Sequence, residues 1–151
     1  HANSANQALD RIINFFPEEK RQQVLMDLSL NIKGLISQRL IPRQTGVGRI
    51  AAMEVMLQSP LISDLIFKGE VTRIKEIMAK STRIGMQTFD QDLFQLYENG
   101  KISYEEAIRN ADSKNELRLR IKLESKRDKP TAVDDAGGLQ VMEEQEKARR
   151  Y

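Results

Sequence analysis

The chain contains a single histidine, His1, which stands just before an amphipathic segment that begins near Ser4. An imidazole at the start of a helix lies beside unpaired backbone amides and the positive end of the helix dipole, where a phosphate oxygen would be stabilised. A frayed terminus or a tag remnant is the simpler explanation, and the residue types alone favour it. His1 is therefore a candidate phosphate contact that needs support from the residues around it.

A glycine-bearing stretch at residues 46–49, Gly-Val-Gly-Arg, is the second candidate for holding phosphate. It has no Lys-Ser or Lys-Thr pair, and it does not lead from a strand into a helix as a phosphate-binding loop does. Short apolar segments flank it at residues 35–41 and 49–56. These features favour a hairpin turn between two antiparallel strands.

Acidic residues gather in the second half of the chain, at Asp90, Asp92, Glu98 and the pair Glu105-Glu106. Paired carboxylates could perform acid–base chemistry, but Asp90 and the glutamate pair fall in predicted first turns of helices. Negative charge is stabilising there by about 0.3–1 kcal/mol, so we assign these residues to helix capping. The absence of cysteine and the single histidine exclude thiol catalysis and a histidine-based metal cluster, so no metal ligands are predicted.

Composition indicates an ordinary globular chain. Its 151 residues, 40% hydrophobic and 30% charged, allow one domain with a core. A net charge of +2 and 5% aromatic residues provide neither the field nor the stacking surface for nucleic acid, so no nucleic-acid partner is predicted. No apolar run approaches the roughly 18 residues that span a bilayer.

Hydrophobic spacing predicts a mostly helical chain around the strand pair. Apolar residues at i, i+3 and i+4 mark the helices, and Thr88 with Gln91 and Ser103 with Glu106 form capping boxes. The predicted helices cover residues 4–16, 17–28, 59–69, 71–82, 88–99 and a stretch from 103.

Residues 116–124 alternate between apolar and charged side chains, a period of two that predicts a strand. A helix is the alternative, because Ser113 and Glu116 have the spacing of a third capping box. Beyond Lys126 the chain is rich in charge, proline and glycine, so we expect a mobile tail.

Three motifs occur in one order along the chain. They are His1-Ala2-Asn3-Ser4-Ala5, Gly46-Val47-Gly48-Arg49-Ile50-Ala51-Ala52-Met53-Glu54 and Gly85-Met86-Gln87-Thr88-Phe89-Asp90-Gln91-Asp92-Leu93. Together they resemble the C-terminal half of the type IV pilus retraction ATPases, the PilT/PilU family, and within it the PilU branch. The similarity runs from His1 to about Lys126.

The resemblance implies an α/β fold class: the C-terminal portion of a RecA-like P-loop ATPase domain, mostly helical with a strand hairpin at the sheet edge. It implies a distal part of the ATPase core over residues 1–58, a C-terminal helical subdomain over 59–126 and a flexible charged tail over 127–151. It also places His1 in the family's histidine box, on the γ-phosphate side. Arg49 becomes a candidate contact near the nucleotide or a neighbouring subunit.

The segment 59–68 aligns with the family's Ala-Ile-Arg-Asn-Leu-Ile-Arg-Glu motif, which is tied to pilus retraction rather than to hydrolysis. This chain departs from the motif. Ser63 stands where an arginine is usual, Asp64 replaces asparagine, and Phe67 and Lys68 replace Arg-Glu. The departures suit a PilU-like accessory motor, in which we expect these four residues to serve coupling or an interface.

The resemblance further implies a hexameric ATPase that couples ATP hydrolysis to pilus retraction. ATP and Mg²⁺ are the expected cofactors of the full-length parent, whereas this segment lacks the P-loop and is expected to bind neither alone and to be inactive. The expected partners are identical subunits in a homo-hexamer, a PilT-like co-motor and the inner-membrane platform protein of the pilus machine. The expected location is cytoplasmic, peripheral to the inner membrane at the pilus base. The alternatives are a segment of a pilus-extension or type II secretion ATPase, and a non-enzymatic helical interaction module.

Overall fold

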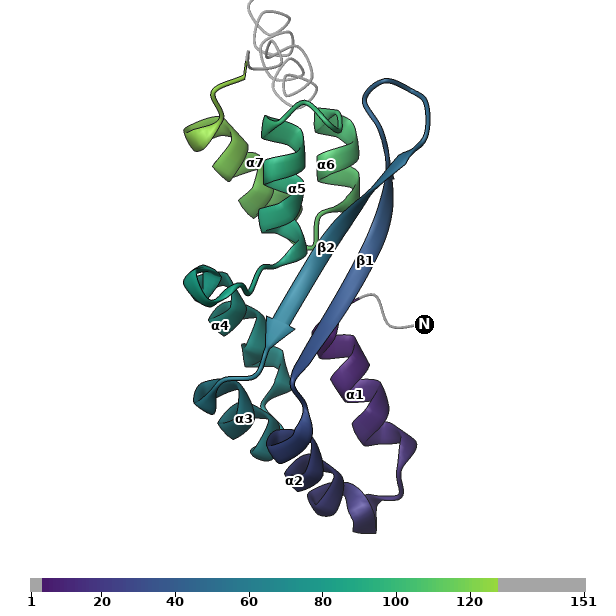
Figure 1. Ribbon diagram of the computed structural model, residues 1–151, viewed down its shortest axis with the longest axis vertical. Helices are drawn as coiled ribbons and strands as arrows, with labels where there is room; N and C mark the ends of the chain where they lie inside the picture. The colour runs from purple at the N-terminus through teal and green to yellow at the C-terminus, as the bar shows by residue number, and fades with distance from the viewer. Residues whose placement is uncertain (1–3, 128–151) are drawn as a thin grey trace, which may run out of the picture.

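An antiparallel hairpin forms the spine of the structure, a computed structural model that describes residues 4–127 (Figure 1). Within these residues, two α-helices precede the hairpin along the chain and five follow it, with short 3₁₀ turns between several of them. The elements in chain order are α1 (Ala5–Phe15), α2 (Arg21–Asn31), β1 (Gly34–Pro42), β2 (Arg49–Leu57), α3 (Pro60–Phe67), α4 (Ile74–Lys80), α5 (Phe89–Glu98), α6 (Tyr104–Asn110) and α7 (Lys114–Glu124).

The predicted hairpin is confirmed. Strands β1 and β2 pair along their whole length, and Pro42 stands opposite Arg49 at the turn end. There the amide of Arg43 donates a hydrogen bond to the carbonyl of Gly48 at 3.1 Å. Gly46 and Gly48 have φ angles of 75° and 76°, in the left-handed region where a side chain would be strained. The glycines therefore make the turn rather than a phosphate cradle.

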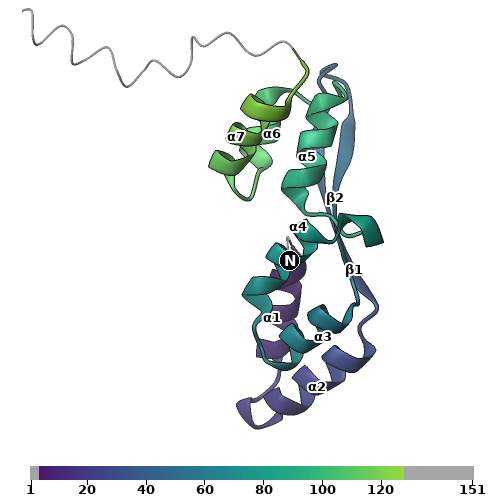
Figure 2. The same ribbon diagram turned by 90° about the vertical axis from the view of Figure 1, so that its left-hand side faces the viewer.

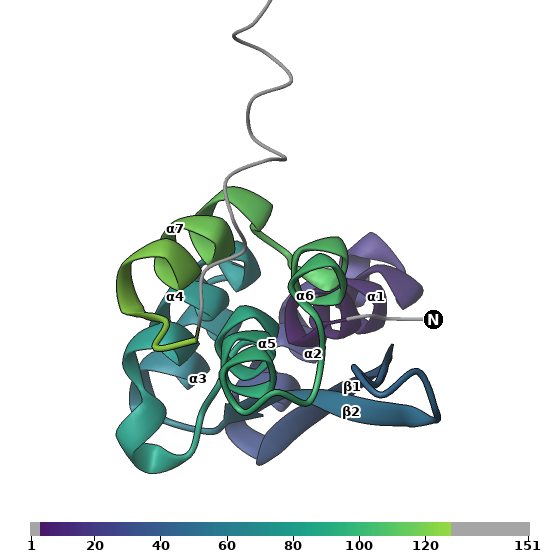
Figure 3. The ribbon, with the colours of Figure 1, turned by 90° about the horizontal axis from the view of Figure 1, so that it is seen from above.

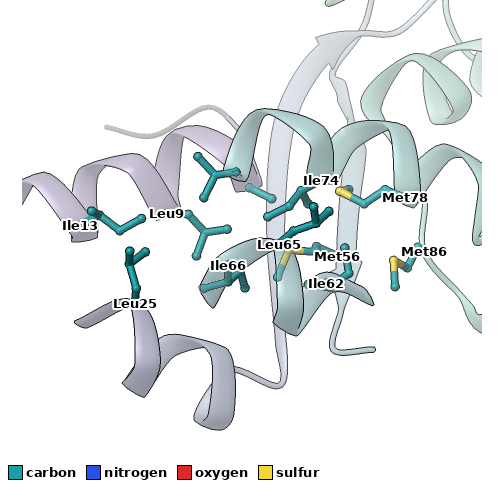
Figure 4. Packing of buried hydrophobic residues seen from close by; sticks show 12 residues of the cluster. Leu9, Ile13, Leu25, Met56, Ile62, Leu65, Ile66, Ile74, Met78 and Met86 are labelled. Atoms are coloured by element: carbon teal, nitrogen blue, oxygen red, sulfur yellow. The ribbon is translucent and has the colours of Figure 1, made fainter. Parts of the chain in front are cut away.

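A first hydrophobic cluster fills the end of the hairpin away from the turn, between α1, α2, α3 and α4 (Figure 4). Helix α3 begins as its sequence predicts: Pro60 is its first residue, and Oγ of Ser59 accepts a hydrogen bond from the amide of Ile62 at 3.3 Å. The fully buried members of the cluster include Ala5, Leu9, Met56, Ile62, Ile66, Ile74 and Met78.

A second hydrophobic cluster lies at the turn end, where α5, α6 and α7 pack on one side of the hairpin (Figure 2). The predicted capping box of α5 is formed: the amide of Gln91 donates to Oγ1 of Thr88 at 3.3 Å, and the amide of Thr88 donates to Oε1 of Gln91 at 3.0 Å. Ile41 from β1 and Ala52 from β2 complete this cluster. The two clusters divide the helices into α1–α4 and α5–α7, and the expected boundary between residues 1–58 and 59–126 stays a prediction.

The predicted strand at residues 116–124 is wrong, because this stretch forms helix α7. The helix packs against α5 and α6 through residues four apart, which buries Leu117 and Ile121 and leaves Leu119 and Leu123 exposed. A strand here would have needed a partner for its backbone groups, whereas a helix satisfies most of them internally. The capping box proposed for Ser113 is not formed, since its side chain makes no capping hydrogen bond.

The opposite face of the hairpin keeps apolar side chains at the surface. In β1, Ile36 is 68% exposed and Leu40 is 55% exposed, and both alternate with residues that face the helices. Seen from above, the hairpin lies to one side of α5, α6 and α7 (Figure 3). Helices of the described residues therefore cover one face of a sheet whose other face is partly apolar. The mobile tail expected over 127–151 falls, after Arg127, outside the described residues.

The packing of α7 predicts unequal effects of two leucine substitutions. Leu117→Ala should lower the free energy of unfolding by about 2–5 kcal/mol, because it empties part of the second cluster. Leu119→Ala should change it by less than about 0.5 kcal/mol, because that side chain is exposed. Urea unfolding of the 151-residue chain measures both values. Equal losses would indicate that the two leucines share a buried face, as they would in a strand.

Candidate functional site

The residues selected from the sequence lie at separate places. His1 falls outside the described residues. Arg49 is exposed at the turn end of β2, and its carbonyl accepts a hydrogen bond from Nε of Arg43 at 3.2 Å. Ser63, Asp64 and Phe67 lie on α3, beyond the far end of β2, and Lys68 directly follows this helix (Figure 1). Nine residues of strand span roughly 26 Å, so Arg49 and α3 do not meet within one copy of the chain.

Helix α3 presents its selected residues to solvent while its apolar face is buried. Asp64 and Lys68 form an ion pair at 2.7 Å, with side chains 48% and 53% exposed. Phe67 is 45% exposed, and Ser63 is half-buried. An exposed ion pair contributes about 0–1 kcal/mol to the free energy of unfolding, so the fold does not depend on the pair of Asp64 and Lys68. The structure leaves these residues accessible to a partner.

Glu54 is a buried carboxylate that lies within one of the three sequence motifs and had no predicted role. Its side chain is 1% exposed on the inward face of β2, between Ala52 and Met56. Oε1 accepts a hydrogen bond from the amide of Ala5, the first residue of α1, at 2.7 Å. Oε2 has no hydrogen-bond partner among the residues that the structure describes. An acidic residue at an inward position of an apolar strand was the signal available in the sequence.

The environment of Glu54 disfavours its charged form. Burial raises the pKa of its carboxyl group above the ordinary value, and the negative charge of Asp112 adds to the increase. The amide of Ala5, the ammonium of Lys75 and the amide of Phe89 act in the opposite direction without cancelling it. Glu54 thus lies among fixed dipoles and charges that determine when it ionises.

A charged cluster beside Glu54 joins four elements. The guanidinium of Arg39 donates hydrogen bonds to Oδ1 of Asp112 and to the carbonyl of Asn110, each at 2.7 Å. It also lies 3.9 Å from the centre of the Phe89 ring. Lys75 forms an ion pair with the same aspartate. Arg39, Lys75 and Asp112, which we call the Asp112 cluster, thereby connect β1, α4, α5 and the loop between α6 and α7.

The structure adds long-range partners to two acidic residues that lie in the first turn of α5, where their predicted capping role places them. Asp90 also accepts hydrogen bonds from the amides of Asp112 and Ser113 at 2.7 and 2.9 Å, which holds the start of α7 on α5. Asp92 accepts one from the amide of Met53 at 2.7 Å and holds α5 on β2. Their partners are 22 to 39 residues away, and local spacing gave no sign of them.

A cleft of about 590 Å³ opens beside the Asp112 cluster, between α4, α5 and α7. Burial would raise the pKa of Asp112, but hydrogen bonds from Lys75 and Arg39 outweigh it and keep this pKa below its usual value. Burial raises the pKa of Asp90 despite its two amide donors. Lys75 and Asp112 pair with each other at this cleft and Asp90 binds two backbone amides, and these contacts hold the elements together.

The described residues do not fit a complete nucleotide or metal site. Within residues 4–127, no three histidine, cysteine or acidic side chains are placed to hold a metal ion. The glycine-bearing loop is a turn, as shown above. None of the helices in this part of the chain has the length and apolar character to cross a bilayer. We therefore derive no catalytic step from these residues alone.

Known proteins resemble the chain in both sequence and structure. It is 51% identical over its whole length to the type IV pilus ATPase PilU of Pseudomonas aeruginosa, an alignment of 153 residues that covers 40% of PilU. The type IV pilus retraction ATPase PilT of the same organism is 37% identical over 111 residues, 74% of this chain and 32% of PilT. The crystal structure of the pilus retraction motor PilT with bound ADP superimposes on 79% of this chain and 33% of its own, with a TM-score of 0.69 and 33% identity.

The chain spans 40% of the PilU relative and about a third of the PilT relatives. No protein-family model matches it. The aligned region of PilU includes every element that the structure describes, because the match runs along the whole chain.

The Asp112 cluster predicts a pH-dependent contribution to stability. Asp112→Asn should lower the free energy of unfolding by about 1.5–3 kcal/mol at neutral pH, because it leaves Arg39 and Lys75 without their carboxylate. The loss should shrink as the pH falls below the ordinary value of 3.8, since a carboxyl with a lowered folded pKa stabilises only while ionised. Urea unfolding at several pH values measures it.

Asp64→Asn is the matched control, since it removes an exposed ion pair worth about 0–1 kcal/mol. Equal losses for the two variants would show that the Asp112 cluster contributes no more than a surface pair.

Proposed function

Because this chain belongs to the type IV pilus retraction ATPase family, we propose that it is the C-terminal segment of a hexameric twitching-motility ATPase, acting as a PilU-like accessory motor. Its relatives confirm the predicted family and the fold class, a C-terminal portion of a RecA-like α/β ATPase domain. The observation that carries the proposed function is the 51% identity to PilU along the whole chain.

The full-length parent, in this proposal, binds ATP with Mg²⁺ and hydrolyses it. The related PilT motor binds ADP in its crystal structure, which supports a nucleotide here. Its phosphate-binding loop and metal ligands would come from outside residues 4–127, which do not fit a complete site. His1 would face the γ-phosphate, and Arg49 would contact the nucleotide's surroundings or a neighbouring subunit. The isolated segment would bind neither ATP nor Mg²⁺.

Assembly accounts for the apolar surface that this segment leaves uncovered. The outer face of the hairpin exposes Ile36 and Leu40, and a single two-stranded hairpin is marginally stable on its own. We assign this face to contacts with the rest of the ATPase domain and with neighbouring subunits of a homo-hexamer. The hairpin would also lie at the edge of a larger sheet in this proposal.

Coupling to the pilus machine falls to α3 in this proposal. The accessible ion pair of Asp64 and Lys68 and the half-exposed Phe67 form a surface on which an aromatic anchor can bind a partner. The partners proposed are a PilT-like co-motor and the inner-membrane platform protein of the pilus machine. The proposed location is the cytoplasmic face of the inner membrane at the pilus base.

Phe67→Arg in the full-length protein tests the proposal. We expect Mg²⁺-dependent ATP hydrolysis within about twofold of wild type, because Phe67 lies on no described part of a nucleotide site. Twitching motility, or binding to the PilT-like co-motor, should fall strongly, since the anchor is lost. Enzyme-coupled ATPase assays and motility assays measure the two.

Ile84→Arg serves as the matched control, because Ile84 is a similarly exposed apolar residue outside α3, at 55% exposure. It should preserve both hydrolysis and motility. Absence of ATP hydrolysis by the wild-type protein would contradict the ATPase function. A Phe67→Arg variant that keeps full motility, or one that unfolds, would contradict the coupling role.

A further inference from the structure

Glu54 lies at a position where a carboxylate is energetically unfavourable. Its carboxylate is 1% exposed on an otherwise apolar strand face, where burying a charge is costly unless it is paired and fully hydrogen-bonded. The carboxylate is not fully hydrogen-bonded, because Oε2 has no hydrogen-bond partner among residues 4–127. Oε1 accepts a hydrogen bond from the amide of Ala5. Its placement is explained if the position of that amide matters.

The start of α1 is held by two separate devices. Ser4 caps the helix locally, since its Oγ accepts a hydrogen bond from the amide of Gln7 at 3.3 Å. Glu54 reaches Ala5 from 49 residues away at 2.7 Å. The local cap fixes the conformation of the first turn, whereas the hydrogen bond from β2 fixes where that turn lies relative to the hairpin.

We propose that Glu54 is a positioning residue that ties the start of α1 to strand β2, and that turnover depends on this tie because α1 directly follows the proposed histidine box in the sequence. The proposal rests on the proposed function, in which His1 belongs to a histidine box. His1 precedes Ala5 by four residues in the sequence. A displacement on the order of 1 Å in a group that meets the reacting phosphate is enough to slow turnover.

Asp92 provides a matched comparison, because it makes the same kind of contact with β2 at Met53, the residue next to Glu54. Its carboxylate also accepts a hydrogen bond from a backbone amide at 2.7 Å, that of Met53 on β2, and burial also raises its pKa. It differs in what it holds: α5 instead of α1. A simple stabilising role predicts similar consequences for the loss of either carboxylate, whereas positioning of α1 predicts different ones.

The experiment uses the full-length protein with Glu54→Leu, Glu54→Gln, Asp92→Leu and Asp92→Asn. Hydrogen exchange of the peptide covering residues 5–9 is measured without nucleotide, and kcat and KM are measured with Mg²⁺ and ATP. Glu54→Leu should speed exchange at the start of α1 and lower kcat by about tenfold or more, with a smaller change in KM. Glu54→Gln, which keeps an acceptor for the amide of Ala5, should restore part of both. The Asp92 variants should leave exchange in α1 unchanged and kcat within about twofold.

Unchanged exchange at residues 5–9 in Glu54→Leu would overturn the proposal, because α1 would then be held by other contacts. Faster exchange with wild-type kcat would overturn it as well, since the anchor would be structural only. Parallel losses of kcat in the Glu54 and Asp92 variants would point to general destabilisation and have the same effect. If the wild-type protein hydrolysed no ATP, the proposed function would fall and the positioning role with it, while the exchange data would still decide whether Glu54 anchors α1.

Discussion

The inward face of β2 constrains the whole arrangement, because a two-stranded hairpin is stable only when other elements cover it. Three alternate residues of this face meet three different environments. Ala52 enters the second hydrophobic cluster with α5–α7, and Met56 enters the first cluster with α1–α4. Glu54 lies between them and binds the start of α1. One strand therefore contacts both groups of helices. It also carries Glu54, which together with Asp90 and the Asp112 cluster we call the polar layer.

Hydrogen bonds and ion pairs of the polar layer fix the relative placement of the helices more closely than apolar packing alone would. The Asp112 cluster connects β1 and α4 to the loop before α7, and Asp90 accepts hydrogen bonds from the amides of Asp112 and Ser113 in that loop. Each carboxylate accepts hydrogen bonds from amides or cations that belong to other elements. Buried networks of this kind cost desolvation energy, and in return they select one relative placement of the helices.

Sequence reasoning succeeded where the signal is local. The hairpin turn, the helix at residues 59–69 and the capping box at Thr88 were predicted, because each depends on residues within a few positions of one another. It failed at α7. Leu117 and Ile121 have the spacing of a helix, whereas these two together with Leu119 and Leu123 have the alternating spacing of a strand. Only packing against α5 and α6 decides between them.

The long-range contacts could not be predicted from spacing. Glu54 and Ala5 are 49 residues apart, and nothing in either neighbourhood indicates the other. The role given to Asp90 was local for the same reason, although its partners start a different helix. Glu54, Asp90 and Asp92 lie within the family motifs, but only the fold determines their hydrogen-bond partners.

The most direct test of this account is a pH titration of the Ala5 amide by NMR, in wild type and in Glu54→Gln. A buried carboxylate bonded to this amide should make its chemical shift follow the ionisation of Glu54, with a midpoint above the ordinary value of 4.5. Since the folded pKa is raised, stability should fall as the pH rises from 4.5 through that midpoint, and Glu54→Gln should abolish both effects. An Ala5 shift that does not titrate in wild type would contradict the central role of this contact, whereas a midpoint at or below 4.5 would contradict only the dominance of burial over the hydrogen bond from Ala5.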